Sequence, residues 1–206
     1  MTDNGPYVFA RQPLLVVISG PAAAGKDALI QRMQELNGRF HFVVTATDRA
    51  PRPGEVDGVD YYFVSTAEFN RMIHDDELIE HAIVYGQHKG VPKQHVREAL
   101  ASGLDVLMRL DVQGAEAVRQ LIPQAVLIFL TPGSEAELVQ RLHERGHDTP
   151  EQIERRLATA REEMERVAEF DYVVVNEDGK LDRAVEDVFA IIRAEHCRVK
   201  PRAVIL

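Results

Sequence analysis

The stretch that decides the fold is Leu14-Leu-Val-Val-Ile-Ser-Gly-Pro-Ala-Ala-Ala-Gly-Lys-Asp-Ala-Leu-Ile30. Its apolar start, residues 14–18, predicts a buried strand. Apolar residues at helical spacing follow in residues 28–36 and predict a helix. A loop bounded by Gly20 and Gly25 separates the two, and Lys26 comes next. Glycine permits close backbone approach, and N–H groups at a helix N-terminus form an anion site. The stretch therefore predicts a phosphate-binding loop, with the Lys26 ammonium on the β- and γ-phosphates.

The residue after this lysine is Asp27, where such loops usually carry a hydroxyl residue that reaches magnesium. A tight strand–helix turn with a surface lysine is the alternative, and the flanking strand and helix disfavour it. Asp27 is a hard oxygen donor that can ligate magnesium directly. Without metal it would repel the phosphates. We therefore expect an unusually steep magnesium dependence, which Asp27→Ser should change.

Composition indicates an ordinary globular chain of one domain, with 206 residues, 45% hydrophobic and 28% charged. The net charge of −9 argues against a nucleic-acid partner or an anionic membrane surface. No apolar run approaches the roughly 20 residues of a membrane span. Residues 1–12 lack the apolar core of a secretory signal, so we expect a disordered lead. Cys197 is the single cysteine, which excludes a disulfide framework, and we expect a reducing, cytoplasmic location.

Strands alternate with helices along most of the chain, which predicts an α/β fold with a parallel sheet and helices on both faces. Ligands of such sheets bind at the carboxyl ends of the strands, where Gly20, Asp111 and Asn176 fall. Expected strands are 14–18, 41–47, 61–64, 78–85, 104–111, 125–130 and 171–176, with a turn or strand at 86–91. Expected helices are 28–36, 66–74 (capped by Thr66), 92–100 (Pro92 first), 113–121, 135–145, 150–168 and 181–196.

Residues 48–60 break this pattern with two prolines and two glycines, so they predict a functional loop opening an inserted lobe. Arg49 and Arg52 lie three apart in it. Two guanidinium groups at this spacing suit a doubly charged phosphate, which they bind bidentately. A solvated basic turn is the alternative. Tyr61 or Tyr62 can add a phenolic donor, and the alternative for each is a strand residue that packs the lobe.

Two acidic residues stand in or after apolar strands. Glu80 interrupts Leu-Ile-Glu-His-Ala, and a buried carboxylate needs partners. An ionised carboxylate that accepts from the N1–H and amine of guanine fits, and an exposed strand position is the alternative. Asp111 ends a strand where phosphate-loop enzymes hold magnesium through water. It can equally cap the following helix.

A second basic group lies on helices 135–145 and 150–168, joined by Gly-His-Asp-Thr-Pro. This arrangement resembles a hinged lid, whose arginines would stabilise a transferring phosphoryl group. The alternative is that these arginines lie on solvated helix faces and contact no ligand. The arginines are Arg141, Arg145, Arg155 and Arg156.

From about Leu14 to Glu195 the chain resembles guanylate kinases. The motifs that carry the resemblance are Gly20-Pro21…Gly25-Lys26, Thr45-Ala-Thr-Asp-Arg-Ala-Pro-Arg-Pro-Gly-Glu-Val-Asp-Gly-Val-Asp-Tyr61, Leu-Ile-Glu80, Gly90-Val-Pro, Asp111-Val-Gln-Gly, Arg141-Leu…Arg145-Gly, Arg156-Leu and Val-Val-Val-Asn176. The Arg-x-Pro-Arg-Pro-Gly-Glu block is quite specific to this family.

The resemblance implies the P-loop nucleoside monophosphate kinase fold, with a five-stranded parallel core, an inserted α/β GMP-binding lobe and a helical lid. It implies the reaction ATP + GMP ⇌ ADP + GDP, with Mg²⁺ and GMP or dGMP as acceptor. The expected division is core 13–44 and 97–196, lobe 45–96, lid 142–158 and tail 197–206. The tail would dock on the core or pair with a partner, and the chain would be a monomer or homodimer.

The resemblance also implies residue roles. ATP would contact Gly20, Pro21, Ala22, Ala23, Ala24, Gly25, Lys26, Asp27, Ala28, Arg141 and Asn176. GMP would contact Thr45, Arg49, Arg52, Tyr61, Glu80, Lys89, Gly90, Val91, Asp111 and Gly114. Lys26, Arg49, Arg145 and Arg156 would be catalytic, and Asp27 and Asp111 would hold the metal.

Five positions depart from the commonest family pattern: Asp27, Asp48, Lys89, Val91 and Arg109. Arg109 stands where that pattern has the first aspartate of an Asp-x-Asp pair. Together they resemble the guanylate kinases of plant plastids and some bacteria, whose loop also reads Gly-Lys-Asp. Two other functions remain: a non-catalytic guanylate-kinase-like binding module, and a ribose 1,5-bisphosphate kinase. Retention of Lys26, Arg145 and Arg156 argues against the first. Glu80 with the Arg49–Arg52 block argues against the second.

Overall fold

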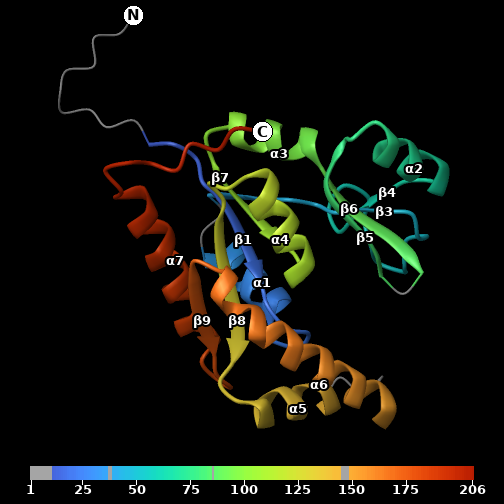
Figure 1. Cartoon of the computed structure of the whole chain (residues 1–206), viewed down its shortest axis with the longest axis vertical. Helices are drawn as coiled ribbons and strands as arrows, with labels where there is room; N and C mark the ends of the chain where they lie inside the picture. Colours follow the sequence, from blue (N-terminus) through green and yellow to red (C-terminus); the bar gives the residue numbers. More distant parts are fainter. Residues whose placement is uncertain (1–10, 37–38, 85, 145–148) are drawn as a thin grey trace, which may run out of the picture.

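The computed structural model describes residues 11–36, 39–84, 86–144 and 149–206. Its central sheet has five strands, all parallel, as the sequence predicts. Their spatial order is β2 (Phe40–Phe42), β7 (Asp105–Arg109), β1 (Leu15–Ser19), β8 (Val126–Pro132) and β9 (Tyr172–Asn176). Because the strands are parallel, their carboxyl ends meet at one edge, which lies toward α5 and α6 in Figure 1.

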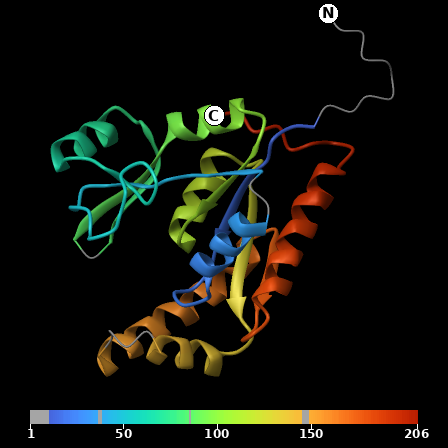
Figure 2. The same ribbon diagram turned by 180° about the vertical axis from the view of Figure 1, so that it is seen from behind.

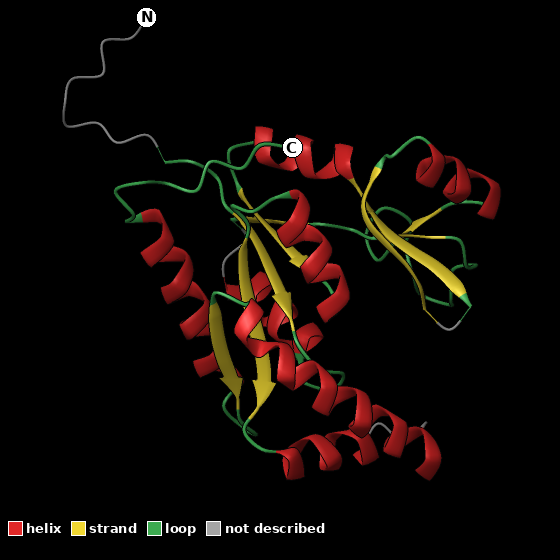
Figure 3. Ribbon diagram, in the orientation of Figure 1, coloured by secondary structure: helices red, strands yellow, loops and turns green. Residues whose placement is uncertain are grey.

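Strand β1 is buried on both faces, which explains its uninterrupted apolar sequence. Val16 and Ile18 face one hydrophobic cluster, and Leu15 and Val17 face the other. Helices α1 (Lys26–Leu36) and α7 (Leu181–His196) cover the first face, and α3 (Lys93–Ala101) and α4 (Val112–Leu121) cover the second (Figure 3). The predicted three-layer arrangement is therefore confirmed.

A second, mixed sheet stands beside the first in both views (Figures 1 and 2). Its order is β4 (Tyr62–Phe63), β3 (Ala46–Thr47), β6 (Gln87–Pro92) and β5 (Leu78–Val84). Helix α2 (Thr66–His74) packs on it through Phe69 and Met72, which form a small separate core with Ala46 and Leu78. These elements run from Ala46 to Pro92, and the lobe bounds of 45–96 stay a prediction.

Helices α5 (Glu135–Glu144) and α6 (Pro150–Glu165), followed by a 3₁₀ turn (Arg166–Glu169), lie at the carboxyl edge of the main sheet. Leu138 and Leu142 of α5 pack against Ile153 of α6 and against Ala23 of the predicted phosphate loop. The Thr149 side chain accepts from Gln152 N–H and forms a capping box, which explains where α6 begins. The helix pair therefore rests directly on the loop.

Three local predictions were wrong. Residues 41–47 do not form one strand, because β2 belongs to the first sheet and β3 to the second. Ser65, not Thr66, caps α2, since the Ser65 hydroxyl accepts from Glu68 N–H. Pro92 ends β6 and lies at the N-cap of α3 instead of inside the helix. The last two errors are boundary shifts of one or two residues. The first arises because the chain passes from one sheet to the other, which secondary-structure propensity does not reveal.

The tail docks on the core, which was one of its two expected positions. Val204 and Leu206 pack against the apolar cluster beneath α3 and α4. Arg202 Nε donates to Glu195 Oε2 at 2.8 Å, and its Nη2 lies 3.5 Å from Asp171 Oδ1. Residues 1–10 of the expected disordered lead lie outside the described residues, and Arg11 is held by Asp105. No helix among the described residues combines the length and apolar character that crossing a membrane demands.

Candidate functional site

The loop between β1 and α1 has the backbone that a phosphate-binding loop requires. Gly20 has φ of +132° and Gly25 has φ of +93°. A Cβ on Gly20 would overlap the carbonyl oxygen of Leu130, and one on Gly25 would overlap the Asn176 amide. Glycine is therefore needed at both positions for conformation and for space. The loop and first turn also contain the other predicted ATP contacts, Pro21, Ala22, Ala23, Ala24 and Ala28.

The loop is held from inside and from behind. Lys26 Nζ donates to the carbonyl oxygens of Gly20 and Pro21, the latter at 2.9 Å. Asn176 Nδ2 donates to Ala24 O at 2.9 Å, and Arg141 Nη2 donates to Asn176 O at 2.7 Å. Arg141 on α5 and Asn176 on β9, both predicted as ATP contacts, thus hold the loop from behind through hydrogen bonds.

Asp27, in the first turn of α1, forms an ion pair with Arg109 at the end of β7. The sequence marks both as departures from the family pattern but does not pair them. The signal was topological: β1 and β7 are neighbours, with Ile18 opposite Arg109, so residues that follow β1 meet residues that end β7.

Cationic side chains gather around Tyr61, the residue before β4 of the second sheet. Arg49 Cζ lies 4.8 Å from the centre of the Tyr61 ring, and Lys89 Nζ lies 5.5 Å from it. Arg49 is only 8% exposed, and both its terminal nitrogens donate to Glu55 at 2.6 Å. This fork holds the pKa of Glu55 well below its usual range, at about 2. The cluster brings together three of the predicted phosphate contacts.

Glu55 contacts this cluster and His88 adjoins it in the chain, although the sequence motifs did not assign a role to either residue. Glu55 also accepts from Arg52 N–H at 2.7 Å, so it ties the two ends of the Arg-Ala-Pro-Arg turn together. Asp48 accepts from the His88 main-chain N–H at 2.8 Å, and its Oδ2 lies 2.7 Å from His88 Nδ1. Since Asp48 precedes Arg49 and His88 precedes Lys89, this contact positions both cations. The sequence signal for Glu55 was the presence of an acidic residue in the same turn as two arginines, which it can pair with.

Glu80 and Asp111 form a pair of neighbouring carboxylates. A Cβ on Gly114 would lie 3.4 Å from Glu80 Oε2 and 3.3 Å from Asp111 Oδ1, so both oxygens border this glycine. Asp111 Oδ1 accepts from Gly114 N–H at 2.7 Å, which confirms the capping alternative for Asp111. Glu80 accepts no hydrogen bond from the described residues. Burial first, and the Asp111 charge second, raise the pKa of Glu80 to about 7. A ligand with two N–H donors would relieve this cost.

The raised pKa of Glu80 gives a testable pH dependence. The folded protein binds more protons than the unfolded chain between pH 4.5 and about 7, so the free energy of unfolding falls as pH rises through this window. We expect Glu80→Gln to remove a decline on the order of 2 kcal/mol between about pH 5 and about pH 8, measured by urea unfolding. The exposed Glu98→Gln is the control, and an unchanged slope in Glu80→Gln would contradict the assignment.

The remaining predicted residues divide by exposure. Thr45 is half-buried, and Arg52 is exposed at the turn. Gly90 and Val91 are buried, and Val91 is 1% exposed within the core beneath α3, so any contact with GMP falls to its main chain. Arg145 lies outside the described residues, as do residues 145–148 of the expected lid, whereas Arg156 is half-buried on α6. Arg155, from the same basic group, is exposed.

Glu163 of α6 also reaches the site, although nothing in its charged helix face distinguishes it in the sequence. Burial raises the pKa of Glu163, while the nearby Lys26 charge opposes the rise and Asp111 adds to it. A cavity of about 620 Å³ adjoins the site on the other side. It is lined by Asp27, Arg109, Thr45, Glu55 and Tyr61, among others, so it runs from the phosphate loop to the Tyr61 cluster.

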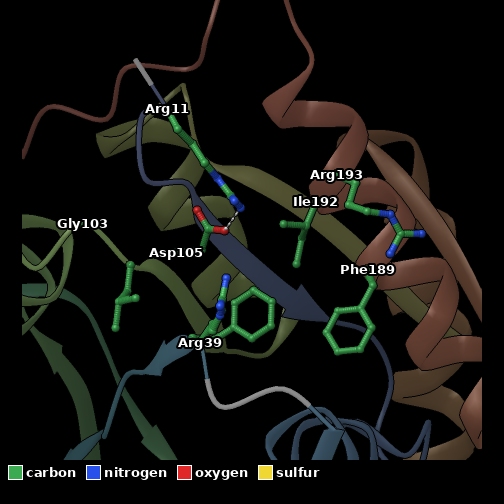
Figure 4. Close-up of a pocket in the computed structure, with 9 residues that line it drawn as sticks. Arg11, Arg39, Gly103, Asp105, Phe189, Ile192 and Arg193 are labelled. Carbon is green, nitrogen blue, oxygen red and sulfur yellow. Dashed lines mark hydrogen bonds and ion pairs between the residues drawn. The ribbon is translucent and has the colours of Figure 1, made fainter. Parts of the chain in front are cut away.

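A different cavity, of about 420 Å³, lies at the opposite edge of the sheet (Figure 4). Asp105, the first residue of β7, is its buried acid, and its partners are all supplied by the chain. It accepts from Arg11 Nη2 at 3.1 Å and from Leu14 N–H at 2.9 Å, and His196 Nε2 lies 2.8 Å away. This cluster fixes where the chain enters β1.

Comparisons with known proteins agree with this geometry. The family model described as guanylate kinase matches residues 12–195. The rice protein named guanylate kinase 2, chloroplastic/mitochondrial, is 53% identical over 203 residues, which are 98% of this chain and 71% of the relative. A guanylate kinase of Desulfitobacterium hafniense is 46% identical over 91% of this chain and 92% of its own. The crystal structure of guanylate kinase from Anaplasma phagocytophilum matches with a TM-score of 0.73 at 29% identity, over 93% of this chain and 90% of that one. The chain belongs to the guanylate kinase family, and its fold is the P-loop nucleoside monophosphate kinase fold.

Proposed function

We propose that this chain transfers the γ-phosphoryl group of ATP to GMP or dGMP, giving ADP and GDP or dGDP. The observation that carries the acceptor is Glu80, a half-buried carboxylate beside Asp111 that has no donor among the described residues. The N1–H and amine of guanine supply two donors on one edge, which adenine does not. Thr45, Gly90, Val91 and Gly114 complete the base pocket in this proposal.

The phosphate of GMP is assigned to the Tyr61 cluster. Arg49 and Lys89 are already held against the Tyr61 ring, and Arg52 follows on the same turn. Glu55 preorganises the Arg49 fork, so little side-chain entropy is lost when a phosphate replaces or joins it. Arg156 and Arg145 of the lid segment would bring further positive charge to the transferred group as the lid closes.

On the donor side, the loop N–H groups and Lys26 bind the β- and γ-phosphates of ATP. The acceptor oxygen of GMP attacks the γ-phosphorus in line, with no covalent enzyme intermediate. Positive charge from Lys26 and the arginines stabilises the charge on the three equatorial oxygens. Closure of α5–α6 over the loop would exclude water and so limit ATP hydrolysis.

The residues present fit a magnesium ion. Asp27 and Asp111 offer hard oxygen donors at the carboxyl edge of the sheet, and Asp27 is exposed. Groups of three or more His, Cys, Asp or Glu able to hold a metal alone are absent from the described residues. That donor set suits an ion that binds through one or two carboxylates, phosphates and water. Bound there, Mg²⁺ would neutralise the β- and γ-phosphates.

The test is an assay of ADP release with GMP, dGMP, AMP and ribose 1,5-bisphosphate as separate acceptors. We expect ADP with GMP and dGMP and little with the others. ADP with ribose 1,5-bisphosphate alone would favour the sugar-phosphate kinase, and no ADP with any acceptor would favour a non-catalytic binding module.

The cellular compartment, the partners and the oligomeric state are inferred from general properties of the chain. A cytoplasmic location is supported by Cys197, an exposed free thiol that suits a reducing compartment. The net charge of −9 supports the absence of a nucleic-acid partner. A monomer or homodimer is proposed, and sedimentation equilibrium would distinguish the two.

A further inference from the structure

The ion pair between Asp27 and Arg109 lies inside the proposed nucleotide site. Asp27 directly follows Lys26 at the start of α1, and Arg109 ends β7, the strand that leads to Asp111. Both side chains line the 620 Å³ cavity beside the loop. The two positions therefore present a carboxylate and a guanidinium where the common family pattern has a hydroxyl and an acid.

This pair contributes little to folding stability. The Asp27 side chain is 71% exposed and the Arg109 side chain 41% exposed. Exposed ion pairs are screened by water and lose side-chain entropy, so they stabilise folded proteins only slightly. Folding stability therefore does not explain why this pair lies at the cavity.

The effect of the pair on a bound nucleotide is larger. Asp27 lies beside the position assigned to the β- and γ-phosphates of ATP. Its negative carboxylate would therefore repel these negative phosphates. In the structure the Arg109 guanidinium pairs with this carboxylate and so offsets part of its charge. A divalent cation that ligates Asp27 competes with Arg109 for it, because both cations neutralise the same carboxylate.

We propose that Arg109 is a positioning residue that holds Asp27 in the metal-free protein and competes with Mg²⁺ for it. The proposal rests on the proposed binding of ATP at this loop. It corrects the expectation drawn from Asp27 alone: metal-free ATP is not strongly repelled, and the magnesium dependence is shallower than an unpaired aspartate would give.

The experiment measures the dissociation constant of ATP by isothermal titration calorimetry, once with EDTA and once with saturating Mg²⁺. The quantity of interest is the ratio of the metal-free to the magnesium-bound constant. Arg109→Met removes the competing cation while keeping side-chain length, so the ratio should rise by about tenfold or more. The half-saturating Mg²⁺ concentration at fixed ATP should fall.

The matched variants are Asp27→Ser and the double variant Asp27→Ser/Arg109→Met. In the Asp27→Ser background, Arg109→Met should change the ratio by less than about threefold, because the shared carboxylate is gone. Arg32→Met is the control: Arg32 also pairs from α1, with Asp182 at 2.7 Å, but its pair lies outside the cavity, so the ratio should not change.

An unchanged ratio in Arg109→Met would overturn the proposal. So would a rise that persists in the double variant, since Arg109 would then act on the phosphates directly. Failure of the proposed function has a different signature, namely wild-type protein that binds no ATP or forms no ADP with GMP.

Discussion

Lys26→Met should lower kcat for ADP formation by about a hundredfold or more, because a charge that faces the transferring phosphoryl group acts mainly in the transition state. The ammonium is already confined by the carbonyl oxygens of Gly20 and Pro21. It can therefore meet the phosphates with little reorganisation, and water cannot replace it with equal effect. Steady-state kinetics with saturating ATP and GMP measure the loss.

The control for this variant is Lys180→Met. Lys180 is an exposed lysine that pairs with Glu177 at the surface before α7, so its loss should leave kcat unchanged. Thermal unfolding of both variants shows whether the loop still folds. If Lys26→Met keeps kcat within about threefold of wild type, the placement of Lys26 on the reacting phosphates is wrong.

Arg49→Lys should lower kcat/KM for GMP by about a hundredfold and leave the KM for ATP unchanged. The substitution keeps the positive charge but removes the planar fork that Glu55 engages with two bonds of 2.6 Å. Lysine cannot bind a phosphate bidentately, and charged hydrogen bonds of this kind contribute about 1.5–3 kcal/mol each. Initial rates at varied GMP and fixed ATP measure the change.

Arg71→Lys is the matched control because it lies in the same lobe. Arg71 engages Glu68, Asp75 and Glu77 on the exposed face of α2. Its substitution should affect stability slightly and GMP kinetics not at all. Equal losses in Arg49→Lys and Arg71→Lys would mean that the lobe, and not a phosphate contact, responds to arginine replacement.

Much of the fold could be read from the sequence, because burial on both faces leaves a clear signal. The uninterrupted apolar strands β1 and β8 and the glycine-bounded loop were visible without any structure. Local chemistry was also readable where few residues settle it, as with the helix predicted to begin at residue 150, where α6 begins. The division of residues 41–47 between two sheets was not, since strand pairing depends on partners distant in sequence.

The site divides in the same way. The sequence by itself determined which residue types are present: a phosphate loop with Lys26, the Arg49–Arg52 turn, and an acid at Glu80 in an apolar strand. Only the tertiary structure decided their partners. It placed Glu80 beside Asp111, which raises the pKa of Glu80 to about 7, and it joined Asp27 to Arg109 across neighbouring strands. The physical reason is that charge and burial act through space, so an interaction between residues 82 positions apart leaves no local pattern in the chain.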